Sequence, residues 1–436
     1  MADAHRDVDG ASDAAGSSPA EAPGQSSPQQ PVPVGGPLAP LRGGGRGWTL
    51  LFVATGWLFM NGFRVVLPVL LPGIKADFHI SNAEAGVALT VLWLLYAALQ
   101  FPAGLAADRT GERRLLVAST VLAAASFGAF YVAPAYAWFL FACALFGFGA
   151  GLYGTPRDML LTRTYPRAVN TAFGITFAVG SVGAAGLPFV ATAVANRFGW
   201  RVAIAALLPL LLLVGLGLWW AVPRRPPGAE TADRLPVVET VRQSVAALAE
   251  PRVALAGAIM LIYVFTYQGL SSFLPTYLVE VKGLEAGPVA LLFGLLFVFG
   301  AAVNPVAGHL ADRFGERETV LGLIGLATVT LAVLPVLHDR IALYLLVPLL
   351  GVRIAIGPIL SAFIVRELPA PVQGTGWGFL RTGFFALGAT ASTVIGLFAD
   401  AGRFDAGFLL LAGLTGLTAI LWLRVPRSRA DAGVEA

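Results

Sequence analysis

The stretch "GLAADRTGERR" at residues 104–114 has a close copy, "GHLADRFGERE", at residues 308–318. Within these stretches the heptapeptides "ADRTGER" and "ADRFGER" agree at six of seven positions. Each copy stands between two apolar runs that are long enough to cross the hydrocarbon core of a bilayer, which takes about 20 residues. A charged motif that occupies the same place in two apolar patterns indicates an internal duplication.

The composition of the chain predicts a membrane protein. Of its 436 residues, 57% are hydrophobic and 12% are charged, whereas soluble proteins carry about 25% charged residues. The mean hydropathy is +0.76, and the apolar runs are continuous rather than amphipathic, so we expect an all-α protein in a lipid bilayer. The net charge of +4 comes from short basic clusters between the apolar runs, which argues against a nucleic-acid partner.

Twelve apolar runs of spanning length are present, six before and six after a polar middle segment. We therefore expect twelve transmembrane helices in two pseudo-symmetric halves of six. The expected spans are 48–71, 85–106, 115–134, 136–160, 169–194, 200–222, 253–278, 286–310, 319–337, 341–364, 374–398 and 404–424.

Polar segments set the expected domain limits. Residues 1–47 are rich in Pro, Ser, Gly and Gln, so we expect a disordered cytoplasmic tail. The first six-helix half is 48–222 and the second is 253–424. The cytoplasmic linker 223–252 has valines near helical spacing, which predicts a short interfacial helix, and 425–436 is expected to be a second cytoplasmic tail.

The distribution of basic residues predicts the orientation, because cytoplasmic loops carry an excess of Lys and Arg. With both ends cytoplasmic, the inner segments near the spans hold 18 basic residues and the outer loops hold 6. We therefore expect a multi-pass protein of the cytoplasmic membrane with both termini inside. This orientation also places both copies of the motif on the cytoplasmic side.

Two further pairs of similar segments support the duplication. "NGFRVVLP" at 61–68 is matched by "QGLSSFLP" at 268–275, and "LWWAVPRR" at 218–225 by "LWLRVPRS" at 421–428. Repeats of this kind build one large class of secondary transporters, whose substrate site lies near mid-membrane between the halves.

The repeated motif resembles the signature of the major facilitator superfamily, which reads approximately G-x-x-a-D-r-x-G-r-r after the second helix. "FGWR" at 198–201 is also similar to that family. The resemblance covers the chain from Trp48 to about Arg427. It implies a twelve-helix fold, transport of a small solute by rocker-switch alternating access, and no enzymatic activity.

The resemblance also implies that the loops form a cytoplasmic latch, closed when the transporter faces outward. Glycines of the motif are expected to allow close helix approach and tight turns. Its aspartates and arginines are expected to bind helix ends or opposite charges. Asp158, near the inner end of the fourth span, is the expected partner of the first copy. The other predicted gating residues are Gly104, Asp108, Arg109, Gly111, Arg113, Gly308, Asp312, Arg313, Gly315 and Arg317.

Four arginines fall within the expected spans. Insertion of an arginine at the centre of a membrane helix is unfavourable by at least about 2.5–3.5 kcal/mol, so we expect each of these arginines to have a function or a stabilising partner. Arg353 is nearest to mid-span and either binds substrate or sits in a structural pair or water-filled pocket. Arg64 is a second substrate-binding candidate, and Arg381 is a candidate for substrate binding or gating. Arg157, next to Asp158, suits gating or local pairing.

The expected substrate is an anion. No acidic residue falls clearly at mid-membrane, and arginine offers a planar fork for carboxylate, phosphate, nitrate or sulfonate oxygens. Neutral hydrogen-bonding groups come from Asn61, Tyr267, Gln268 and Asn304. Each of these either binds substrate or joins two helices. The resemblance places spans 1, 4, 7 and 10 at the cavity.

Within the superfamily, the chain resembles the organic-anion symporters most, through "RVVLPVLLPGIKADFHIS" from Arg64 and "GFGAGLYGTP" at 147–156. Those symporters often carry a Glu where this chain has Ala150. The predicted function is secondary active transport of a small organic or inorganic anion, with H⁺ or Na⁺ as the coupling ion. The alternative is a drug or metabolite exporter, whose fifth-span glycine motif is matched in part by Gly174 and Gly183. We expect no cofactor, no metal site and a monomer.

Overall fold

The computed structural model describes residues 45–166, 168–224, 250–368 and 373–425, with a few positions between 239 and 246. Within this part of the chain, twelve helices are long and apolar enough to cross a membrane. The twelve predicted spans are thus confirmed. The two predicted tails and most of the predicted linker helix lie outside the described residues.

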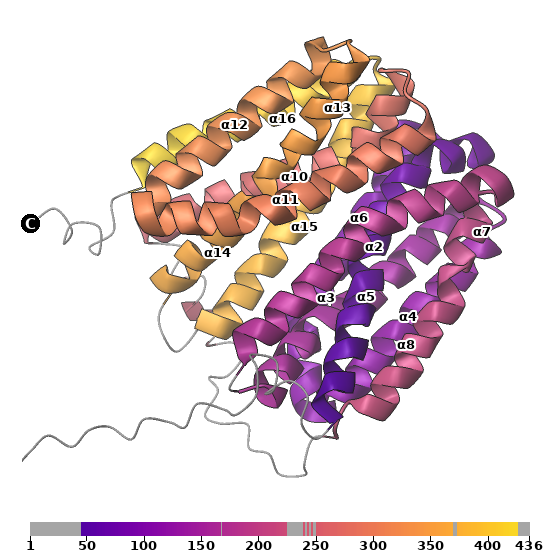
Figure 1. Cartoon of the computed structure of the whole chain (residues 1–436), viewed down its shortest axis with the longest axis vertical. Coiled ribbons are helices and arrows are strands. Elements are labelled where there is room, and N and C mark those ends of the chain that lie inside the picture. Colours follow the sequence, from indigo (N-terminus) through magenta and orange to yellow (C-terminus); the bar gives the residue numbers. More distant parts are fainter. Residues whose placement is uncertain are drawn as a thin grey trace, which may run out of the picture. The chain divides into compact units, whose positions relative to one another are not determined.

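The first six spans run from Arg46 to Ala221 (Figure 1). The sixth is divided at Ala206, where one helix ends and the next begins. The helices are α2 (Arg46–Phe78), α3 (Asn82–Thr110), α4 (Glu112–Tyr131), α5 (Tyr136–Thr164), α6 (Val169–Phe198), α7 (Trp200–Ala205) and α8 (Leu207–Ala221).

The second six spans run from Pro251 to Arg424. The tenth contains a 3₁₀ helix of six residues, η2, and this segment carries Arg353. The elements are α10 (Pro251–Glu280), α11 (Ala286–Phe314), α12 (Glu316–Val336), α13 (Arg340–Leu349), η2 (Leu350–Ala355), α14 (Ile356–Glu367), α15 (Gln373–Asp400) and α16 (Phe404–Arg424).

The repeated motif forms the same tight turn in both halves. Gly111 ends α3 and begins α4 with φ 84°, and Gly315 ends α11 and begins α12 with φ 95°. This region of φ is strained for residues with a side chain, so the predicted role of both glycines is confirmed. We call the membrane face that carries these two turns the motif face, and the other the opposite face.

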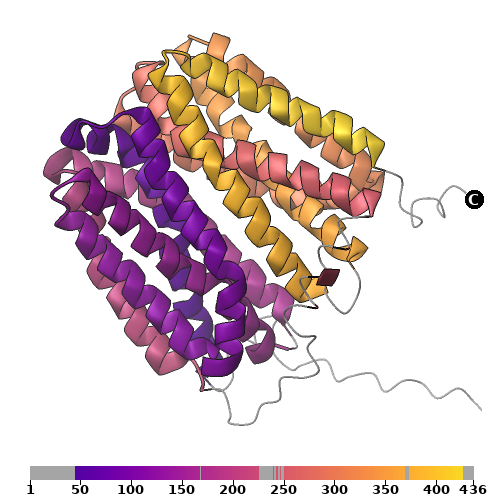
Figure 2. The ribbon, with the colours of Figure 1, turned by 180° about the vertical axis from the view of Figure 1, so that it is seen from behind.

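The two halves meet mainly along two helix pairs, α3 with α15 and α6 with α11, and α2 also contacts α10. Figure 2 shows α15 (light orange) running beside the indigo and purple helices of the first half. Near the opposite face these backbones touch: a Cβ at Gly86 of α3 would lie 2.4 Å from the carbonyl oxygen of Ser392 in α15. Gly396 stands equally close to the carbonyl of Asn82.

Candidate substrate site and gates

Arg64 is buried in the middle of α2 with 7% of its surface exposed. Its guanidinium carbon lies 3.8 Å from the ring centre of Tyr96, 5.2 Å from that of Trp93 and 5.4 Å from that of Trp57. Its Nε and Nη2 atoms are buried and have no hydrogen-bond partner. Aromatic faces thus surround the cation, and two of its nitrogen atoms lack a hydrogen-bond acceptor.

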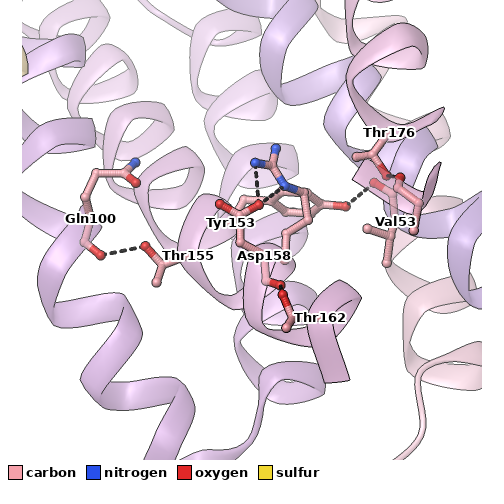
Figure 3. Close-up of polar contacts among 9 residues, drawn as sticks. Val53, Gln100, Tyr153, Thr155, Asp158, Thr162 and Thr176 are labelled. Atoms are coloured by element: carbon pink, nitrogen blue, oxygen red, sulfur yellow. Dashed lines mark hydrogen bonds and ion pairs between the residues drawn. The ribbon is translucent and has the colours of Figure 1, made fainter. Parts of the chain in front are cut away.

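Arg157 pairs with its neighbour Asp158 on α5. Its Nε and Nη2 atoms donate to Asp158 Oδ1 over 2.8 and 2.7 Å, which is the local pairing predicted for these residues. Figure 3 shows Asp158 together with Tyr153 and Thr155, which belong to the same helix. The predicted contact of Asp158 with the first copy of the motif stays a prediction.

Arg353 faces the interior of the second half. Its Nη1 and Nη2 atoms donate to the carbonyl and hydroxyl oxygens of Thr266 over 3.2 and 2.5 Å. The cavity beside it has a volume of about 10 Å³, and α10, α12, α14 and α16 contribute to its walls. Because a single water needs about 10–15 Å³, no solute fits there. These contacts favour the structural alternative for Arg353, and its role as a substrate ligand stays a prediction.

Arg381 lies on α15, in the other half from Arg64. It is half-buried, and its guanidinium carbon lies 5.5 Å from the ring centre of Phe385. Phe385 packs on Tyr96, with 6.0 Å between ring centres. Tyr96 thus contacts Arg64 on one side and the second half on the other. Tyr96 was not among the predicted site residues.

The four neutral candidates differ in their contacts. Asn61 donates to the carbonyl oxygen of Gly180 over 3.1 Å, so it joins α2 to α6. Gln268 is fully buried, and neither of its amide atoms has a hydrogen-bond partner. Asn304 has a buried Oδ1 without a partner. Tyr267 is half-buried and stacks on Tyr263, with 6.2 Å between ring centres.

The glutamate of each motif copy forms an ion pair that the sequence analysis missed. Arg163, at the end of α5, donates to both carboxylate oxygens of Glu112 over 3.1 and 3.2 Å. Arg366, near the end of α14, donates to both oxygens of Glu316 over 2.5 and 2.6 Å. The two pairs occupy equivalent places in the two halves, and that repetition could have identified them.

Other motif residues have contacts of several kinds. Arg317 donates to the carbonyl oxygen of Leu423 over 2.6 Å, and Arg113 lies over the ring of Trp219 at 4.3 Å. A Cβ at Gly104 would lie 3.1 Å from Thr155 Cγ2, which confirms the expected close helix approach. At Gly308 the expectation is wrong in this conformation, because a Cβ there would meet no atom within 4 Å.

The remaining gating predictions are not decided by these contacts. Asp108 has an interaction partner within the described part of the chain. The side chain of Asp312 lies outside the described residues. Arg109 and Arg313 stay predicted gating residues.

On the opposite face, polar contacts join the two halves. Lys75, near the end of α2, donates to Glu280 Oε1 of α10 over 2.6 Å and to Asn82 Oδ1 over 2.5 Å. The carboxylate of Asp400, at the end of α15, accepts hydrogen bonds from the backbone N–H groups of Asn82 and Ala83, both over 2.8 Å. Asp400 thus caps the first turn of α3 from the other half.

On the motif face, the ion pairs between described residues stay within one half. Arg157 with Asp158 and Arg163 with Glu112 belong to the first half, and Arg366 with Glu316 belongs to the second. The structure is therefore closed on the opposite face, where the Lys75–Glu280 ion pair, the hydrogen bonds to Asp400 and close backbone contacts cross between the halves.

Comparison with known proteins identifies the family. The family model of the Major Facilitator Superfamily matches residues 52–392. The probable nitrate/nitrite antiporter NarK1 of Thermus thermophilus is 28% identical, over 74% of this chain and 75% of its own length. The probable sulfoacetate transporter SauU of Cupriavidus necator is 23% identical, over 82% of this chain and 88% of its own length.

A solved structure supports the fold. The bacterial homologue of the human lysosomal transporter Spinster, in an inward-facing and unoccupied conformation, aligns with a TM-score of 0.75 and 15% identity over 89% of this chain and 99% of that one. At this identity the likeness concerns the fold alone. The repeated motif, the twelve helices and the match of the family model together show that this chain belongs to the major facilitator superfamily.

Proposed function

We propose that the protein is a secondary active transporter of small anions and that Arg64 is the main anion ligand. The observation that carries the proposal is the free edge of this guanidinium, where Nε and Nη2 are buried without a partner. In the described part of the chain, no carboxylate forms an ion pair with Arg64.

The energetics favour an anion at this place. Burial of an ion in a protein interior costs several kcal/mol after relaxation. The contacts with Tyr96, Trp93 and Trp57 offset part of this, because a desolvated cation–π contact is worth about 2 kcal/mol. A carboxylate, nitrate or sulfonate on the Nε/Nη2 edge supplies two charge-assisted hydrogen bonds and the missing counter-charge.

The names of two relatives agree with this substrate class. One is described as a nitrate/nitrite antiporter and the other as a sulfoacetate transporter, and both substrates are anions. In the proposed site, Arg381 and Tyr267 contribute from the second half. Arg353 acts as a positioning residue that holds Thr266 of α10 against η2.

In this proposal, contacts between the halves on the opposite face alternate with contacts between the halves on the motif face. In the conformation described above, Lys75, Glu280 and Asp400 hold the opposite face closed. We propose that the motif face is cytoplasmic, so that this conformation faces inward. In the outward-facing conformation these contacts separate, and the motif loops close against the other half through Asp108 and Asp312.

A second candidate function is export of an apolar drug or metabolite. The observation that favours it is a cavity of about 500 Å³ between α10 and α15. Its lining is apolar except for Thr382 and includes Leu261, Phe379 and Leu387. This cavity contains none of the membrane arginines, so the two candidate functions use different surfaces.

Transport by liposomes that contain the purified protein separates the two candidates. The panel is nitrate, succinate, sulfoacetate, inorganic phosphate and the lipophilic cation tetraphenylphosphonium, each under an H⁺ gradient, a Na⁺ gradient and no gradient. We expect saturable uptake of at least one anion and none of the cation. Transport of the cation alone would contradict the proposal and favour the exporter. The gradient arms identify the coupling ion.

A further inference from the structure

The site contains two arginines from different halves that share one group of aromatic rings. Arg64 of α2 lies over Tyr96 at 3.8 Å, Tyr96 packs on Phe385 at 6.0 Å, and Arg381 of α15 lies over Phe385 at 5.5 Å. The contacts therefore place two positive charges at one site between the halves.

The counter-charges near this site do not balance the positive charges. Arg157, whose guanidinium carbon lies 4.0 Å from the ring centre of Trp57, is neutralised by Asp158. Arg64 and Arg381 have no ion-pair partner in the described part of the chain. Two positive charges thus remain uncompensated.

The contact of Arg157 with Asp158 shows how an arginine in this region binds a carboxylate. Arg157 uses its Nε and Nη2 atoms to hold the carboxylate of Asp158. The same two atoms of Arg64 are buried and without a partner. Because Nε and Nη2 lie on one edge of the guanidinium, they form a fork that suits two oxygens of one anionic group.

Resting on the proposed anion transport, we propose that the substrate is a dianion with two separate anionic groups. One group binds the Nε/Nη2 edge of Arg64, and the other binds Arg381. A monoanion leaves one of the two charges uncompensated in a desolvated site, which is unfavourable. A dianion also bridges the two halves, so its binding favours the conformation in which they approach each other on the motif face.

Matched pairs of anions test the charge class. Liposomes that contain the full-length protein are supplied at neutral pH with malonate, succinate or glutarate, each beside its monoamide, and with sulfoacetate beside its amide. Each pair has nearly the same size and differs by one charge. Because a hydrogen bond to a charged group is worth about 1.5–3 kcal/mol, we expect kcat/KM for the dianion to exceed that of its monoanion by about 10- to 100-fold.

Variants at Arg381 identify the second binding group. Arg381→Gln is expected to lower kcat/KM for the dianions by about tenfold or more, so that the ratio of dianion to monoanion uptake falls toward one. Arg381→Lys keeps the charge and is expected to retain part of the preference for the dianion. The control is Arg340→Gln, an exposed arginine of the same half outside the site, which should keep the full preference.

The outcomes separate this inference from the proposed function. Equal uptake of both members of each pair, or an unchanged preference in folded Arg381→Gln, would overturn the dianion while anion transport stands. Uptake of no anion in the panel would overturn both. If Arg381→Gln does not elute as a folded protein in size-exclusion chromatography, the wild-type pairs and Arg381→Lys decide the question.

Discussion

Lys75 and Glu280 face each other across the two halves on the opposite face, with 2.6 Å between Nζ and Oε1. Lys75 also binds Asn82, and the backbone N–H of Asn82 binds Asp400. Four helices, two from each half, thus meet in one polar network. A conformation that is open on the opposite face, which is the outward-facing one in the proposed orientation, requires that this network breaks.

Lys75→Gln is expected to raise the population of the outward-facing conformation by up to about fivefold, because partly exposed ion pairs contribute about 0.2–1 kcal/mol. The measurement is the distance between spin labels at His79 and Glu285, both exposed on the opposite face. The only cysteine, Cys143, is first replaced by Ala. A distance distribution identical to that of the unsubstituted protein would show that this ion pair does not hold the gate. The exchange Lys75→Glu with Glu280→Lys is the control and should restore the original distribution.

The motif glutamates are expected to differ in their contribution to stability. The side chain of Glu112 is 3% exposed and that of Glu316 is 34% exposed. Glu112→Gln leaves Arg163 beside a neutral buried group and should cost about 1–3 kcal/mol, whereas Glu316→Gln should cost less than about 1 kcal/mol. Thermal unfolding in detergent measures both, and equal shifts in Tm would contradict the account.

Two glycines of the packed helices form a matched pair for a packing test. A Cβ at Gly147 would lie 2.2 Å from the carbonyl oxygen of Leu92, so α3 and α5 cannot stay in place in Gly147→Ala. A Cβ at Gly186 would meet no atom within 4 Å. We expect a lower yield and a lower Tm for Gly147→Ala. Gly186→Ala should be neutral or up to about 1 kcal/mol more stable, because alanine is the better helix former. The idea fails if both variants behave alike.

Replacement of Arg353 distinguishes a structural role of this residue from a role in substrate binding. Because it binds Thr266 in an enclosed cavity, Arg353→Gln should lower Tm and leave the KM for the transported anion within about twofold, since about 0.4 kcal/mol corresponds to that ratio. Flux at several substrate concentrations gives the KM. A stable Arg353→Gln protein without anion uptake would instead establish the ligand role.

The sequence was sufficient for the fold because hydropathy fixes the spans and duplication fixes their grouping. It also predicted the turns at Gly111 and Gly315, since a tight reversal with positive φ favours glycine whatever the surroundings. The depth of Arg353 in its span follows from counting residues. The direction of its side chain does not, because it depends on the rotation of the helix and on the 3₁₀ turn.

The remaining parts of the site come from contacts between distant segments. Tyr96 meets Arg64 because one particular face of α3 is turned toward Arg64, and the spacing of residues within α3 does not reveal that face. Lys75 and Glu280 lie 205 positions apart, and each alone has the appearance of an ordinary loop charge. Gly308 was predicted from its equivalence to Gly104, but this conformation leaves it without a close neighbour.

Replacement of Arg64 tests the central claim, that this buried guanidinium binds the transported anion. The measurement is the initial rate of uptake by liposomes of whichever anion the unsubstituted protein transports, with protein content and folding matched by size-exclusion chromatography. We expect Arg64→Gln to lower kcat/KM by about 100-fold or more, because both charge-assisted hydrogen bonds are lost, and Arg64→Lys to retain a small part of the activity. A folded Arg64→Gln protein that transports the anion at a rate within about twofold of the unsubstituted protein would contradict it.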